Sequence, residues 1–246
     1  MPLREEFEAT GNWLFKWRGQ LPILLYIALF VLLYLQPNEQ FAPFTNTYWS
    51  IFCLLVNLTG LGFRAYTIGH TPKNTSGRNT EAQLADSLNT KGIYSIVRHP
   101  LYVGNYLMWL GLLLYAGNIS FALIVSLLYW LYYERIMFAE EAFLRKKFGQ
   151  QYISWASQVP SFIPTFSRWQ TSDLVFSWKN IFKREYTGLL VTVVSFAFIN
   201  GYKHYQQAGV WQLDTFWLVV LIVGIIVALS LRTIKKRSNY FDVQGR

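Results

Sequence analysis

Residues 91–107, KGIYSIVRHPLYVGNYL, join a basic residue, an imidazole and a proline directly to the start of a long apolar run. Residues 138–164, FAEEAFLRKKFGQQYISWASQVPSFIP, follow the end of the next apolar run and begin with the paired carboxylates Glu140 and Glu141. Gly117 and Asn118 between the two runs predict a tight turn, so the runs form an antiparallel helical hairpin. The two charged stretches are therefore expected to meet on one side of a membrane.

The composition is typical of an integral membrane protein. Of the 246 residues, 53% are hydrophobic and only 14% are charged, and the mean hydropathy is +0.23. The net charge of +9 is attributed to loops that face anionic lipid, and no nucleic-acid binding is expected. Cys53 is the single cysteine, which excludes an internal disulfide, and the spacing of the histidines predicts no metal site.

Six apolar segments come close to the roughly 20 residues that a helix needs to cross a bilayer. They are residues 21–36, 48–64, 101–116, 119–133, 187–202 and 216–231. The first is interpreted as a retained span, because the acidic start of the chain does not fit a signal peptide. With these spans, every Lys and Arg except Lys203 lies on the side that holds both termini. We therefore expect an all-α, multi-pass protein of about six transmembrane helices in an inner (cytoplasmic) membrane, with both termini cytoplasmic.

Three parts follow from this division. Residues 1–47 hold an N-terminal cytoplasmic segment and the first span, residues 48–165 hold a core of three spans with cytoplasmic loops, and residues 166–246 hold a two-span hairpin behind an amphipathic segment. Aromatic and basic residues alternate over residues 166–186, which predicts a helix lying in the membrane interface. The polar loop 71–90 ends against the central stretch, where it is placed to act as a lid.

The central stretch offers groups that bind anions. Pro100 fits the first turn of a helix, so His99 stands beside free N–H groups that favour a carboxylate or phosphate. The spacing fits equally well with Arg98 and His99 simply facing the membrane interface. Glu140 and Glu141 suit a cation, ribose hydroxyls or the role of a base, but they also suit a solvated helix face.

A glycine pair lies upstream, near the end of the second span. Gly60 and Gly62 permit a close backbone approach, which in a membrane helix serves packing more often than ligand binding. Arg64 follows them and fits a lipid headgroup, a buried acid or the membrane boundary as its partner.

Taken in order, GLGFRAYTIG at 60–69, GIYSIVRHPLYVGNYLMWLG at 92–111 and ERIMFAEEAFLRKKFGQQYISWASQVPSFIP at 134–164 resemble a known family. It is the family of isoprenylcysteine carboxyl methyltransferases and phospholipid methyltransferases, which are integral membrane enzymes. The resemblance implies a methyltransferase that uses S-adenosyl-L-methionine, with a cytoplasmic cofactor pocket and an acceptor that enters from the lipid.

The resemblance also implies roles for individual residues. Catalytic roles fall to Arg98, His99 and Glu141, with His99 on the carboxylate of the cofactor, and Arg64 and Arg98 would face the substrate. The residues expected to bind the cofactor are Tyr94, His99, Pro100, Leu101, Tyr102, Gly104, Glu140, Glu141, Gly60 and Gly62.

The expected acceptor is a lipid or lipid-linked carboxylate or phosphate. Methyl transfer from a sulfonium to an anion removes opposite charges, so a pocket poor in water favours it and no general base is needed. An amine or hydroxyl acceptor would instead require a glutamate or His99 to take a proton. The sequence leaves open the identity of the acceptor and the role of the last two spans. It also leaves open the oligomeric state, and a homo-oligomer is compatible with it.

Two alternatives from other classes remain. Membrane sterol and steroid reductases that use NADPH share a similar core around the RHP motif, but they favour Asn after the proline, where this chain has Leu101. A scaffold or transporter is the third reading, and the few ionisable residues inside the expected spans argue against an ion path.

Overall fold

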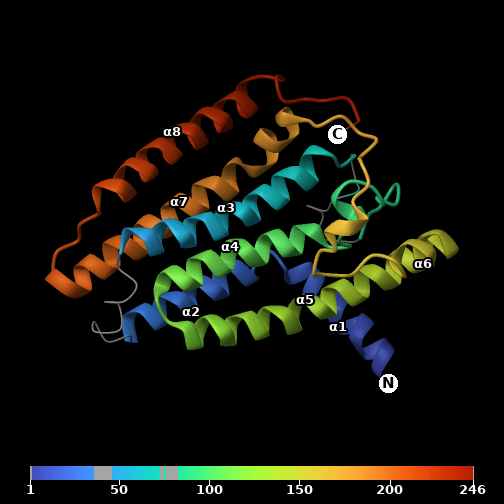
Figure 1. Ribbon diagram of the computed structural model, residues 1–246, viewed down its shortest axis with the longest axis horizontal. Helices are drawn as coiled ribbons and strands as arrows, with labels where there is room; N and C mark the ends of the chain where they lie inside the picture. Colours follow the sequence, from blue (N-terminus) through green and yellow to red (C-terminus); the bar gives the residue numbers. More distant parts are fainter. Residues whose placement is uncertain (1, 36–45, 73–74, 76–82, 246) are drawn as a thin grey trace.

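The computed structural model describes residues 2–35, 46–72, 75 and 83–245, and the regular structure in these ranges is helical, which confirms the all-α prediction (Figure 1). The elements are α1 (Leu3–Trp17), α2 (Leu21–Leu35), α3 (Thr47–Gly69), η2 (Ile93–Ser95), α4 (Pro100–Ala116), α5 (Ile119–Phe148), α6 (Gln150–Ala156), η3 (Phe166–Arg168), α7 (Trp178–Ala208) and α8 (Thr215–Arg237). The 3-10 turn η2 lies within the stretch 91–107, and η3 follows the stretch 138–164.

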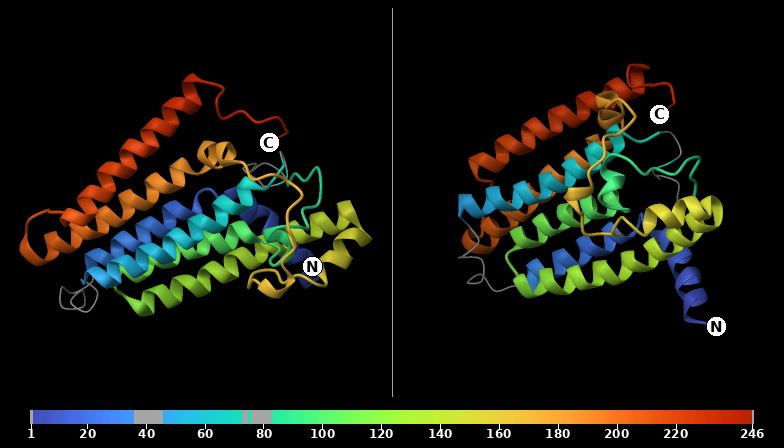
Figure 2. Two further views of the ribbon diagram at one scale, coloured as in Figure 1. Left: turned by 45° about the horizontal axis from the view of Figure 1, so that its top comes forward. Right: turned by 45° about the vertical axis from the view of Figure 1, so that its right-hand side comes forward.

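The longer helices α2, α3, α4, α5, α7 and α8 run alongside one another as an elongated bundle (Figures 1 and 2). The turns from α4 to α5 and from α7 to α8 lie at one end of the bundle. Both chain ends lie at the other end, together with α6 and the segments that lead into α4 and α7. We call this second end the terminal end.

The number of spans is smaller by length and composition than the six expected. Within the described residues, α3, α5 and α8 are long and apolar enough to cross a membrane, and the bent pair α1 and α2 would make a fourth span. The chain is thus a multi-pass membrane protein, while the count of six is not confirmed.

Two helices of the bundle miss the criterion for physical reasons. Helix α4 has only 17 residues, and it packs against α3, α5 and α7. Helix α7 buries polar side chains, which lower its hydropathy. These side chains find partners inside the bundle: Thr192 donates to Asn57, and Lys203 donates to the carbonyl of Tyr115 near the end of α4.

The α4–α5 hairpin forms as its sequence predicts. Pro100 is the first residue of α4, where its missing N–H costs nothing, and His99 is the N-cap. Gly117 ends the helix in the left-handed region, at φ 87°, where a glycine pays no steric penalty. Asn118 then caps α5 by accepting a hydrogen bond from the Phe121 N–H at 2.9 Å.

Helices α3 and α4 approach each other backbone to backbone. A Cβ atom added at Gly60 would lie 2.7 Å from the Met108 nitrogen and closer still to the Gly104 carbonyl oxygen. One added at Gly111 would lie 2.6 Å from the Cys53 oxygen. Small residues therefore set the distance between these helices, as is common in membranes.

The prediction of an interface helix over residues 166–186 is wrong for the first half of that range. After η3 the chain is extended, and α7 begins only at Trp178. The backbone there bonds to distant partners instead of to itself: Gly92 N–H donates to Gln170 O at 2.9 Å, and Ser177 N–H donates to Gly69 O at 2.9 Å. These bonds tie the segment to the loop before α4 and to the end of α3.

Candidate active site

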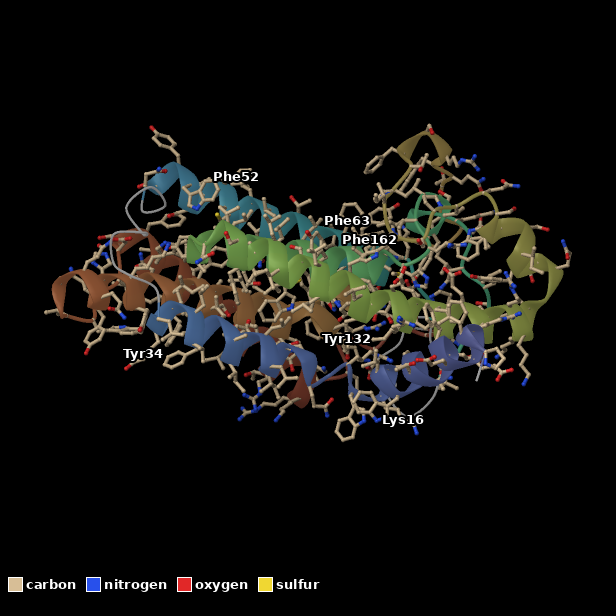
Figure 3. The ribbon with its side chains drawn as sticks, turned by 90° about the horizontal axis from the view of Figure 1, so that it is seen from below. Lys16, Tyr34, Phe52, Phe63, Tyr132 and Phe162 are labelled. Carbon is tan, nitrogen blue, oxygen red and sulfur yellow. The ribbon has the colours of Figure 1, made fainter. Side chains whose placement is uncertain are left out.

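The stretches 91–107 and 138–164 meet at the terminal end, as the hairpin predicts. The chain after α6 returns past the start of α4, where Arg98 N–H donates to Pro160 O at 2.9 Å and His99 N–H donates to Ser161 O at 3.1 Å. Phe162 of this return segment packs on the aromatic side chains of α4 and α5, with its ring 5.2 Å from that of Trp130. Figure 3 shows Phe162 level with Phe63 of α3, and both pack on the same apolar cluster around Ile96.

His99 lies between the two glutamates of α5. Its Nε2 is 3.0 Å from Glu141 Oε1, and its Nδ1 is 3.4 Å from Glu140 Oε2. The imidazole is buried, with 7% of the residue exposed. Both ring nitrogens are thus directed at carboxylates, which differs from the expectation that His99 contacts the carboxylate of a cofactor.

The charge state of His99 follows from these neighbours. Burial alone would lower the pKa of His99, but the hydrogen bonds and negative charges of Glu140 and Glu141 outweigh it, so the pKa is raised above the ordinary 6.5. The raised pKa favours the protonated ring, which bridges the two carboxylates. Tyr102 stacks on this ring at 5.7 Å between centroids.

This arrangement predicts that His99 stabilises the fold most at low pH. A raised pKa in the folded state gives a contribution that is complete below about pH 6.5 and disappears as the pH rises through the folded value. We expect the unfolding temperature of the wild type in detergent, minus that of His99→Gln, to fall between pH 6 and pH 9. A difference that stays constant or grows with pH would contradict the bridged imidazolium.

Glu140 and Glu141 are held by different partners. Tyr102 donates to Glu140 Oε1 at 2.7 Å, and Tyr129 in turn donates to the Tyr102 carbonyl at 2.9 Å. Glu141 Oε1 lies 3.1 Å from Arg98 Nε, and Arg98 Nη1 donates to the carbonyl of Ala156 at 3.0 Å. The cluster therefore has two arms: Tyr102 with Glu140, and Arg98 with Glu141, joined by His99.

A cavity of about 680 Å³ opens beside this cluster. Glu140 lines the cavity, whereas Glu141 lines a separate hollow between α1 and α5. The other predicted residues that line the cavity are Arg64, Tyr94, Arg98, His99, Pro100, Leu101 and Tyr102. From this polar end, the cavity continues between the helices to a mainly apolar end at Tyr26, Met108, Trp109, Leu112 and Val191. The hydrogen-bonded pair Asn57 and Thr192 also lines this end.

Several lining residues were not expected from the sequence. Arg18 follows α1, Arg184 lies on α7, and Asn89 lies in the loop before α4. Trp155 of α6 also lines the cavity, and its indole N–H donates to the Tyr94 carbonyl at 3.0 Å. Trp155 lies in the stretch 138–164, Asn89 in the expected lid loop and Arg184 in the expected interface segment, but none of them was predicted to have a role in the site. The expected lid, loop 71–90, falls partly outside the described residues, at 73–74 and 76–82.

Like Glu141, the three glycines of the predicted cofactor set do not line the cavity. Gly60 and Gly104 lie in the α3–α4 contact, and a Cβ added at Gly104 would come within 2.6 Å of Arg64 Cγ. Gly62 is exposed, with nothing near the position of a Cβ. The packing interpretation of Gly60 is therefore the one that agrees with the structure. Within the part of the chain that the structure describes, no group of His, Cys, Asp or Glu is arranged to hold a metal ion.

The region that holds His99, Glu140 and Glu141 is similar to known proteins. The family model described as phospholipid methyltransferase matches residues 48–151, which cover α3, α4 and α5. The chain is 42% identical over 77 residues to a protein-S-isoprenylcysteine O-methyltransferase of Schizosaccharomyces pombe, covering 31% of this chain and 33% of that protein. It is 39% identical over 79 residues to protein-S-isoprenylcysteine O-methyltransferase B of Arabidopsis thaliana, covering 31% of this chain and 39% of that protein.

The chain is similar over a longer region to a bacterial protein. It is 30% identical over 151 residues to a cobalt-zinc-cadmium resistance protein of Cupriavidus metallidurans, covering 58% of this chain and 67% of that protein. The two methyltransferases are thus matched over only a third to two fifths of their length. No solved structure matches the chain.

Proposed function

Because this chain belongs to the family of phospholipid and isoprenylcysteine carboxyl methyltransferases, we propose that it is a membrane methyltransferase that uses S-adenosyl-L-methionine. The acceptor is a lipid or lipid-linked carboxylate or phosphate. The observation that carries the proposal is the cavity, whose polar end holds the His99 cluster and whose other end is mainly apolar.

The polar end fits the charged parts of such a donor. Glu140 offers a carboxylate to the amino group or the ribose hydroxyls, and Arg98 lies at the same wall for the donor carboxylate. Tyr94 provides an aromatic wall. When bound, S-adenosylmethionine supplies a methyl group activated by a positive sulfur.

His99 and Glu141 act through their neighbours in this proposal. His99 fixes Glu140 at the cavity wall, and Glu141 fixes His99 and Arg98 from behind. Pre-set groups of this kind lower the cost of orienting the reactants. Pro100 and Leu101 form the adjoining wall at the start of α4.

The apolar end fits the tail of a lipid acceptor. His99 and Leu112 both line the cavity, and their separation along α4 corresponds to about 20 Å at 1.5 Å per residue. A charged head near His99 would leave an apolar tail between the helices. Transfer of a methyl cation to an anionic head neutralises charge, which a site poor in water favours.

The site is proposed to face the cytoplasm, with the chain in an inner membrane and both termini on the cytoplasmic side. The distribution of basic residues supports this orientation. With the six expected spans, Lys203 is the single Lys or Arg on the side of the membrane opposite the site. In the structure Lys203 contacts Tyr115 near the far end of α4.

Calorimetry on the protein purified in detergent tests the cofactor. We expect S-adenosylhomocysteine to bind and NADPH not to bind. Tyr102→Phe removes the hydrogen bond to Glu140, so it should weaken S-adenosylhomocysteine binding by about 10-fold, the usual effect of one hydrogen bond to a charged group.

The matched control is Tyr106→Phe on the same helix. The Tyr106 hydroxyl donates to Ser126 at 3.1 Å, away from Glu140, and its loss should leave binding unchanged. Binding of NADPH alone would overturn the proposal in favour of a reductase. If Tyr102→Phe and Tyr106→Phe weakened S-adenosylhomocysteine binding equally, Glu140 would not be part of the cofactor site.

A further inference from the structure

Arg64 is held from two sides at the wall of the cavity. Its Nε donates to Glu185 Oε2 and its Nη2 donates to Glu185 Oε1, both at 2.8 Å. Its Nη1 donates to Asn105 Oδ1 at 2.6 Å. The two bonds to Glu185 form a bidentate pair, the geometry that fixes both the position and the plane of a guanidinium.

The two partners have different positions relative to the cavity. Arg64 and Asn105 line it, while Glu185 does not. The Glu185 side chain is 7% exposed, and that of Arg64 is 23% exposed. Glu185 is thus a buried anchor, and Arg64 is the group that it presents.

The guanidinium keeps donors for a ligand. It has five N–H groups, and three of them bond to Glu185 and Asn105 among the described residues. Two N–H groups on the Nη atoms are left, which is the number that a carboxylate or phosphate accepts from one arginine.

The anchor comes from outside the part of the chain that the family model matches. The family model ends at residue 151, and Glu185 lies on α7. It reaches across 121 positions of sequence to Arg64. The C-terminal hairpin of α7 and α8 therefore contributes to the cavity through this contact.

We propose that Glu185 is a positioning residue that fixes Arg64 for the anionic head of the lipid acceptor. The proposal depends on the proposed function in one respect: that function makes the bound lipid the methyl acceptor. A buried ion pair adds little net stability compared with apolar packing, so a bidentate pair beside a cavity is better explained by the orientation it imposes.

The test measures lipid binding without a methyl donor. The probes are an S-isoprenylcysteine, which carries a lipid-linked carboxylate, and lysophosphatidic acid, which carries a lipid phosphate. Calorimetry in detergent should show that Glu185→Gln weakens the lipid that the wild type binds by about 10-fold or more, as expected when a charged hydrogen-bonded partner is lost. Glu185→Asp keeps the charge and should restore part of the affinity.

A matched control lies two residues away on α7. Lys183 forms an exposed ion pair with Asp242 at 2.6 Å, and Asp242→Asn breaks it without touching the cavity. It should leave lipid binding unchanged. The binding of S-adenosylhomocysteine should change less than about 2-fold in Glu185→Gln, a split that general unfolding would not produce.

The outcomes separate this inference from the proposed function. Loss of lipid binding in Glu185→Gln with rescue by Glu185→Asp supports it, even if the wild type binds no S-adenosylhomocysteine and the proposed function fails. Unchanged lipid binding in Glu185→Gln, equal loss of lipid and S-adenosylhomocysteine, or a wild type that binds neither lipid would overturn it.

Discussion

Replacement of His99 by alanine is expected to reduce methyl transfer by at least about 100-fold and to abolish measurable binding of S-adenosylhomocysteine. The imidazole separates Glu140 from Glu141, and its raised pKa favours the positively charged ring. Without the imidazole no cation lies between the two carboxylates, so the repulsion between their like charges is no longer offset there. Glu140 would then lose its orientation at the cavity wall.

The measurement is transfer of labelled methyl groups to lipid acceptors in vesicles, together with calorimetry on the same preparations. His204→Ala is the matched control, because His204 also pairs with a carboxylate, Asp214 at 2.8 Å, but does not line the cavity. We expect that variant to keep its activity within about 2-fold. A folded His99→Ala protein that retains a third or more of its activity would exclude the central role of this ring.

The parts of the site that local sequence signals encode were predictable. Pro100 marks the start of α4, and Gly117 with Asn118 marks the turn, so the hairpin and the meeting of the two charged stretches followed from the sequence. The pairing of Glu140 and Glu141 on α5 opposite His99 is a consequence of that hairpin. Chemistry-bearing residues that lie on one supersecondary unit are the ones a single sequence reveals best.

Contacts between distant parts of the chain were not predictable in the same way. Arg18 and Arg184 reach the cavity from either side of the family-matched region, and Glu185 pairs with a residue 121 positions earlier. No periodicity or spacing reports such a pair. The extended chain before α7 was missed for the same reason, because its backbone bonds to Gly69 and Gly92 instead of forming a local helix.

The glycines of α3 illustrate a choice that only the packing decides. Gly60 and Gly62 are two residues apart and entered the same expected cofactor set. In the structure Gly60 is buried against α4, whereas Gly62 faces outward. The two glycines of this motif therefore differ in role: the fold requires Gly60 and does not require Gly62.

Gly60→Val is therefore expected to lower the unfolding temperature in detergent by more than about 5 °C, while Gly62→Val leaves it within about 1 °C. The valine Cβ at position 60 would meet backbone atoms of Gly104 and Met108, the latter at 2.7 Å, and backbone cannot move aside as a side chain can. Overpacking of this kind costs about 1–3 kcal/mol or more, and each kcal/mol shifts the transition of a chain of this size by about 2–4 °C.

The glycine pair also tests the site, because Gly104 packs against both Gly60 and the side chain of Arg64. Separation of α3 from α4 by a valine at position 60 should displace Arg64 relative to Asn105 and weaken lipid binding as well as stability. Thermal unfolding and calorimetry on the two variants provide the comparison. If Gly62→Val instead removed S-adenosylhomocysteine binding while Gly60→Val kept both stability and binding, the glycines would belong to the cofactor site, and the helix-packing interpretation would be wrong.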